Sequence, residues 1–218
     1  MDNYTRVKIC GLTTLEDARF ASGALADYLG FIFFDESPRY IEPAKAGAII
    51  NWLEGAKKVG VFVNQALDDV NTIATQTGID YVQLHGNESP EYCKLIHKPV
   101  IKVFRVNDET VPEELNEQLS EFEDVAEFFL FDTKIGNQWG GTGKVFDWSV
   151  LKKLKSTKPY FLSGGLTPDN VSDAVSSVYP YAIDLSSGVE SAPGLKDFDK
   201  LEALFDVLRD VRENQIPE

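Results

Sequence analysis

The pattern of apolar and polar positions divides the chain into two kinds of segment that alternate. Short apolar runs rich in β-branched and aromatic residues are typical of buried strands, and longer segments with apolar residues at helical spacing separate them. The strands are predicted to begin near Val7, Tyr28, Lys57, Tyr81, Val100, Phe128, Tyr160 and Ala182. Helices are predicted over residues 14–24, 43–53, 66–76, 90–96, 113–121, 147–154, 169–178 and 197–212.

Eight repeated βα units favour a closed barrel. An open doubly wound sheet would also alternate strands and helices. The glycine-rich turns, however, follow strands seven and eight, where (β/α)8 barrels commonly bind phosphate, and no GxGxxG turn follows the first strand. We therefore predict an α/β fold of the (β/α)8 TIM-barrel type, with residues 1–218 forming a single domain.

Several helix starts carry sequence signals. Thr13 or Thr14 can cap the first helix, and Asp169 can cap the seventh. Prolines at positions 43, 90 and 112 suit the first turn of a helix, where no hydrogen bond is lost.

Composition and charge exclude several classes of function. The formal net charge of −14 opposes binding to nucleic acid, and no stretch concentrates lysine and arginine. No apolar run is long enough to cross a bilayer, and the polar amino terminus lacks the apolar core of a secretory signal, so we expect a cytoplasmic protein. With only two cysteines and two histidines, neither a disulfide scaffold nor a catalytic metal is expected.

Two glycine-rich turns are candidates for phosphate binding. SGGL at residues 163–166 and SSGVE at residues 186–190 each follow an apolar strand, where exposed backbone amides can approach an anion closely. Each turn alone could equally be an ordinary chain reversal. A third stretch, GNQWGGTGK at residues 136–144, is interpreted as a mobile active-site loop, with a plain surface excursion as the alternative.

Two side chains at strand ends are candidates for acid–base chemistry. Cys10 ends the first strand, and Lys8 on the same inward face could favour its thiolate, although a cysteine here can also be a small buried apolar group. Asp132 ends the sixth strand and would face the same mouth, unless it only fixes a loop. One group could protonate an oxygen while the other removes a proton from carbon.

Two further side chains are weaker candidates for ligand contact. Arg39, just beyond the second strand, could bind a carboxylate or phosphate, but a solvated surface arginine is the alternative. His85 follows the fourth strand and could line the mouth or satisfy a local turn.

Taken together, the motifs resemble those of one enzyme family. They are KICG at residues 8–11, SPR at 37–39, QLHG at 83–86, FDT at 131–133, GGTGKVFDW at 140–148, SGGL at 163–166 and DLSSGVE at 184–190. In this order and combination they resemble the phosphoribosylanthranilate isomerases of tryptophan biosynthesis. The resemblance runs from Val7 to the last helix and implies a (β/α)8 barrel.

The resemblance also implies a reaction and roles for residues. The reaction is the Amadori rearrangement of N-(5'-phosphoribosyl)anthranilate to 1-(2-carboxyphenylamino)-1-deoxyribulose 5-phosphate, through a Schiff base and an enolamine. Asp132 would be the general acid and Cys10 the general base. Arg39 would lie near the anthranilate carboxylate, Asp184 near the sugar and His85 in the substrate pocket. The phosphate would be bound at Gly164, Gly165, Ser187 and Gly188.

The resemblance implies no cofactor, because the protonated imine itself accepts the electrons. The expected partner is the small phosphoribosyl substrate, with no nucleic acid and no membrane, and the chain is expected to be a monomer or a homodimer.

Three alternatives stay open from the sequence. An indole-glycerol-phosphate synthase or a pentose-phosphate epimerase could share the barrel and its phosphate site. An isomerase that also accepts a related aminoaldose is a closer alternative. A non-catalytic binder of phosphoribosyl ligands would retain the phosphate site, but the presence of both Cys10 and Asp132 argues against it.

Overall fold

The computed structural model describes residues 4–133 and 147–213 and contains a closed barrel of eight parallel strands. The strands are β1 (Arg6–Ile9), β2 (Tyr28–Ile32), β3 (Lys57–Phe62), β4 (Tyr81–Leu84), β5 (Val100–Val106), β6 (Phe128–Thr133), β7 (Tyr160–Leu162) and β8 (Ala182–Leu185). Each strand pairs with the next, and β1 closes the ring by pairing with β8. The prediction of a (β/α)8 barrel is confirmed.

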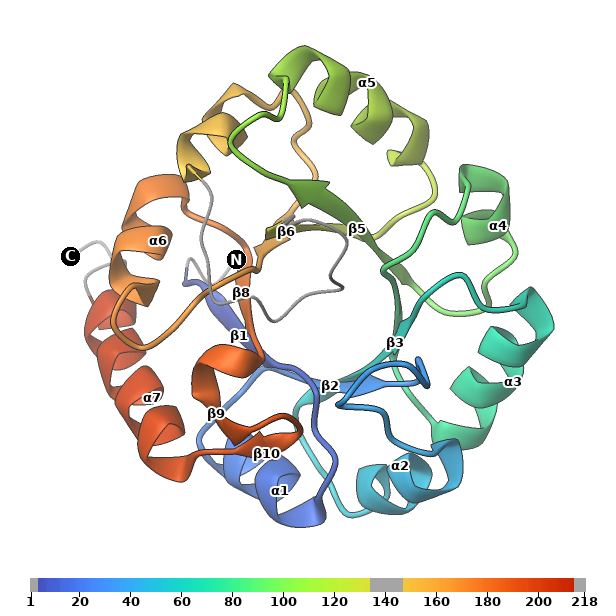
Figure 1. Cartoon of the computed structure of the whole chain (residues 1–218), viewed down its shortest axis with the longest axis vertical. Helices are drawn as coiled ribbons and strands as arrows, with labels where there is room; N and C mark the ends of the chain where they lie inside the picture. The colour runs from blue at the N-terminus through green and yellow to red at the C-terminus, as the bar shows by residue number, and fades with distance from the viewer. Residues whose placement is uncertain (1–3, 134–146, 214–218) are drawn as a thin grey trace.

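Helices form the outer layer around the barrel, as Figure 1 shows in a view along the barrel. They are α1 (Leu15–Gly23), α2 (Pro43–Ile50), α3 (Leu67–Thr77), α4 (Pro90–Lys94), α5 (Pro112–Phe122), α6 (Val171–Val178) and α7 (Phe198–Glu213). Their apolar faces pack on outward-facing strand residues such as Val7, Ile9 and Phe129, and this contact forms the larger hydrophobic core. No described helix is long and apolar enough to cross a membrane.

The start of α1 follows the sequence signal. The side chain of Thr14 accepts a hydrogen bond from the backbone N–H of Asp17, so Thr14 is the cap. The three prolines lie in the first turns of α2, α4 and α5, as predicted.

The structure corrects two predictions for the later units. Between β6 and β7 the predicted sixth helix is a 3-10 segment, η1 (Trp148–Lys153), whose short length is typical of 3-10 helices. The seventh predicted helix, α6, begins at Val171 and not at residue 169. Asp169 is not its cap, because Asn170 occupies the cap position. The side chain of Asn170 accepts a hydrogen bond from the backbone N–H of Thr167.

A small hairpin after β8 was not predicted. The chain leaves β8 through a 3-10 turn, η2 (Ser187–Val189), and forms antiparallel β9 (Glu190–Ala192) and β10 (Leu195–Lys196) before α7. The hairpin lies beside the start of α1 (Figure 1). Thr13 donates a hydrogen bond to the carbonyl of Gly194 at 2.6 Å, which ties the hairpin to the loop after β1.

Candidate active site

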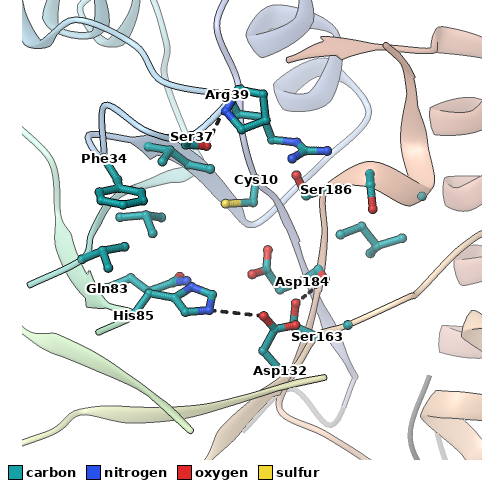
Figure 2. A pocket seen from close by; sticks show the side chains of 18 of the residues that line it. Cys10, Phe34, Ser37, Arg39, Gln83, His85, Asp132, Ser163, Asp184 and Ser186 are labelled. Atoms are coloured by element: carbon teal, nitrogen blue, oxygen red, sulfur yellow. Dashed lines mark hydrogen bonds and ion pairs between the residues drawn. The ribbon is translucent and has the colours of Figure 1, made fainter. Parts of the chain in front are cut away.

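Cys10 lies directly after β1, with its side chain in a pocket at the carboxyl ends of the strands (Figure 2). Its backbone N–H donates to the carbonyl of Leu185 at 2.8 Å, so the pairing of β1 with β8 continues up to the thiol. Gly30 on β2 lies against the thiol, and a Cβ atom there would be only 2.8 Å from Sγ of Cys10. The strand neighbours therefore fix the position of the sulfur.

A buried ion pair lies beside the thiol. The ammonium of Lys8 binds both carboxylate oxygens of Asp184, at 2.9 and 3.0 Å, and Lys8 and Asp184 are register partners on adjacent strands. Burial alone would lower the pKa of Lys8, but Asp184 and Cys10 together outweigh it and raise that pKa. Burial also raises the pKa of Asp184, which Lys8 opposes.

The pKa of Cys10 corrects an expectation from the sequence. Lys8 does stabilise the thiolate, as expected, but burial has the larger effect and raises the pKa of the Cys10 thiol above its ordinary value. The charge of Asp184 raises this pKa further. The motif alone could not give the net direction, because it does not show how completely the sulfur is buried.

Asp132 reaches the same pocket from the end of β6 and contacts His85 at the end of β4. Nε2 of His85 lies 3.2 Å from Oδ2 of Asp132. The other oxygen, Oδ1, accepts from the backbone N–H of Thr133 at 3.0 Å. Arg105 fixes the His85 backbone by donating to its carbonyl at 3.0 Å. The carboxyl group is therefore held in one orientation, with both oxygens in hydrogen-bonding distance of a partner.

The two glycine-rich turns form another side of the pocket. Gly164 and Gly165 have φ angles of +92° and +67°, which only glycine adopts at little cost. Among the described residues, no acceptor is assigned to the backbone N–H of either glycine. Ser187 and Gly188 begin η2, where the first N–H groups of a helical turn lack partners within the turn. Such amides can bind an anion.

Arg39 lines the pocket from the segment after β2, and its guanidinium lies near Ser186 (Figure 2). It is not a solvated surface residue, because only 12% of its side chain is exposed. Its guanidinium forms an ion pair with Glu190 on β9, at 2.7 Å between Nη2 and Oε2.

All predicted site residues line this one pocket. They are Cys10, Arg39, His85, Asp132, Gly164, Gly165, Asp184, Ser187 and Gly188. The glycine-rich stretch 136–144 lies outside the described residues. In the part of the chain that the structure describes, no three His, Cys, Asp or Glu side chains gather as a metal site.

Sequence reasoning missed several polar residues of the site. Gln83 and Ser186 line the pocket, and each has a buried oxygen without a hydrogen-bond partner among the described residues. Buried polar atoms are rarely left this way except at functional sites. Both residues lie inside the motifs QLHG and DLSSGVE, but nothing in those motifs distinguishes a side chain that faces a ligand from one that supports a turn.

Comparison with known proteins decides the family. Residues 7–207 match the family described as N-(5'-phosphoribosyl)anthranilate (PRA) isomerase. The chain belongs to this family. An isomerase of that name from Citrifermentans bemidjiense is 48% identical over 203 residues, which cover 92% of this chain and 95% of the relative.

Solved structures of family members agree with the barrel. A phosphoribosyl anthranilate isomerase from Thermotoga maritima has a TM-score of 0.84 and 38% identity, covering 94% of this chain and 99% of its own. A second structure of the family was solved in complex with reduced 1-(o-carboxyphenylamino)-1-deoxyribulose 5-phosphate. It has a TM-score of 0.81 and 36% identity, covering 94% of this chain and 99% of its own.

Proposed function

We propose that the chain is a phosphoribosylanthranilate isomerase that converts N-(5'-phosphoribosyl)anthranilate to 1-(2-carboxyphenylamino)-1-deoxyribulose 5-phosphate in tryptophan biosynthesis. The observation that carries the proposal is that Cys10 and Asp132 line one pocket together with two amide-rich turns. An acid and a base on either side of a phosphorylated sugar are what an aldose–ketose isomerisation requires.

The proposed reaction begins with the furanose ring. Asp132 donates a proton to the ring oxygen, the bond from C1' to that oxygen breaks, and the anthranilate nitrogen supplies the electrons to form a protonated Schiff base. Its positive nitrogen acidifies the neighbouring C2'–H bond. Cys10, as thiolate, accepts the C2' proton, and the resulting enolamine tautomerises to the ketone. The iminium accepts the electrons in this scheme, so the proposal includes no cofactor.

The remaining substrate contacts follow from the charge of each side chain or amide and from its position in the pocket. The phosphate would bind the amides of Gly164, Gly165, Ser187 and Gly188, which form one side of the pocket. Arg39 would bind the anthranilate carboxylate. His85 would lie beside the substrate, where it also contacts Asp132. Asp184 would contact the sugar.

The partner we propose is this small substrate, without nucleic acid or membrane. We expect a cytoplasmic, single-domain protein that is a monomer or a homodimer, which sedimentation of the purified chain would check.

The test is turnover of freshly made phosphoribosylanthranilate, followed by loss of its fluorescence. We expect the signal to decay with the purified chain, and the Cys10→Ser variant to be slower by at least about 10²-fold, since a hydroxyl is a much weaker base than a thiolate. Binding without decay of the signal would instead favour a non-catalytic binder. Unchanged turnover by Cys10→Ser would assign the base to another group.

A further inference from the structure

Glu190 is a buried carboxylate that holds Arg39 from the side of the hairpin. Nε of Arg39 lies 2.9 and 3.1 Å from the two oxygens of Glu190, and Nη2 lies 2.7 Å from Oε2. Only 3% of the Glu190 side chain is exposed. Burial alone would raise the pKa of Glu190, but Arg39 and Lys196 lower it, so the group is ionised. The guanidinium is therefore fixed by a two-point, charge-assisted contact.

Lys196 holds Glu190 in turn and joins it to the catalytic strands. Its fully buried ammonium lies 2.8 Å from Oε1 of Glu190. The same ammonium donates to the carbonyl of Cys10 at 2.7 Å and to that of Ser186 at 3.3 Å. One lysine thus connects the end of β1, the end of β8 and the carboxylate behind Arg39.

The contact with Glu190 leaves one edge of the guanidinium available. An arginine has five N–H donors in a planar fork, and Glu190 accepts from Nε and from Nη2. Among the described residues, no acceptor is assigned to Nη1 of Arg39. The Arg39 side chain lines the pocket (Figure 2). The edge formed by Nη1 and Nη2 is the one that binds a second carboxylate through two parallel hydrogen bonds.

We propose that Glu190 and Lys196 are positioning residues that hold Arg39 as a preset receptor for the aromatic carboxylate of the substrate. This inference rests on the proposed function, which supplies the identity of that carboxylate. A long side chain that is already fixed loses less conformational entropy when the ligand binds. By holding Arg39, Glu190 therefore raises the affinity for the carboxylate without contacting the ligand itself.

The charge of Glu190 and its role in positioning Arg39 predict opposite effects on ligand binding when Glu190 is replaced. If only charge mattered, removing the negative Glu190 would strengthen the binding of an anion next to Arg39. If position matters, the same change weakens binding, because an amide cannot accept from both Nε and Nη2 while also facing Lys196. The Glu190→Gln variant therefore tests the sign of the effect.

The experiment compares anthranilate, which carries the carboxylate that Arg39 would bind, with inorganic phosphate, which the glycine-rich turns would bind. Dissociation constants of anthranilate and of inorganic phosphate are measured by calorimetry for the parent chain, Glu190→Gln and Glu190→Asp. Glu190→Asp keeps the buried charge but shortens the reach, so it tests position even if the glutamine variant does not fold. We expect both variants to bind anthranilate about tenfold more weakly and phosphate within about twofold. KM should rise while kcat changes little.

Lys200 provides a matched control. It donates to the backbone carbonyl of Glu190 at 2.7 Å and so tethers the same hairpin without contacting the carboxylate. Lys200→Gln should leave anthranilate binding within about twofold. Unchanged or tighter anthranilate binding by the Glu190 variants, or an equal loss in Lys200→Gln, would overturn the inference. Because binding needs no turnover, a parent chain that fails to isomerise would reject the proposed function while leaving this comparison valid.

Discussion

The two ends of the barrel interior differ in chemistry. At the amino-terminal end, inward-facing side chains form a compact apolar cluster of Tyr28, Val59, Ile101, Val103, Phe128, Leu130, Phe161 and Ala182. At the carboxyl-terminal end, Cys10 follows β1, and Asp132 and Asp184 lie two to four residues further along β6 and β8 than the apolar cluster. Alternation along a strand keeps both sets on the inner face.

The difference shows how one fold separates stability from reactivity. At the amino-terminal end, apolar packing excludes water and needs few polar partners. The stability that this packing provides is therefore expected to depend little on ligand or pH. At the carboxyl-terminal end, Asp184 is held by an ion pair with Lys8, and Asp132 by His85 and the backbone of Thr133. The pocket there also leaves polar atoms of Gln83 and Ser186 without a partner among the described residues. Changes at the two ends should therefore affect different properties.

Asp132→Asn is expected to have the largest effect and only on activity. The amide keeps the shape of the side chain but cannot protonate the ring oxygen, so turnover should fall by about 10²–10⁴-fold. The free energy of unfolding should change by less than about 1 kcal/mol, because asparagine has nearly the same shape and its Oδ1 can still accept from the backbone N–H of Thr133. Turnover and urea unfolding measure the two quantities. Near-normal turnover would remove Asp132 as the acid.

Phe161→Ala should give the opposite result. Phe161 is fully buried, and its ring centroid lies 5.1 Å from that of Tyr28 and 5.4 Å from that of Phe128. The cavity should lower the free energy of unfolding by about 3–5 kcal/mol, measured by urea denaturation.

Turnover per folded molecule of Phe161→Ala should stay close to that of the parent chain. Trp52→Ala is the matched control, because Trp52 is an aromatic residue that is 74% exposed, and the change should alter stability by only about 0.5 kcal/mol. A large loss of turnover in folded Phe161→Ala would show that the two ends are not separate.

The barrel could be predicted from the sequence because each strand is a short apolar run, and the segments between strands carry apolar residues at helical spacing. The sequence also predicted that Cys10 and Asp132 lie at the carboxyl ends of their strands and share one pocket, since those ends meet at one edge of the barrel. The strands, the helices and the number of βα units are all visible as local patterns in one sequence.

Pairings between distant residues could not be read in the same way. Lys8 and Asp184 are 176 positions apart, and Arg39 and Glu190 are 151 apart, so no local pattern links either pair. Glu190 and Lys196 belong to a hairpin whose second strand has only two residues, too short for periodicity to reveal. The pKa of Cys10 likewise depends on burial by neighbouring strands and not on its motif.

The Lys8–Asp184 pair marks the boundary between the two ends of the barrel. It is buried like the apolar cluster, yet it acts on the thiol of the pocket. Several groups surround Cys10 and Asp184 in this region. Lys196 from β10 lowers the pKa of Cys10, Asp132 from β6 raises that of Asp184, and His85 after β4 lowers it.

Asp184→Asn tests that boundary and should give the smallest of these effects. Loss of the carboxylate removes a charge that raises the pKa of Cys10 and leaves the ammonium of Lys8 to stabilise the thiolate, so the pKa should fall. Alkylation by iodoacetamide near pH 7, where the thiolate fraction limits the rate, should become about tenfold faster. The measurement is made in a Cys93→Ser background, so that Cys10 is the only thiol. Lys8→Met should slow alkylation, because burial is then unopposed by that charge. If Asp184→Asn slowed the reaction or left it unchanged, the buried pair would act like the apolar end, stabilising the barrel without affecting the thiol of Cys10.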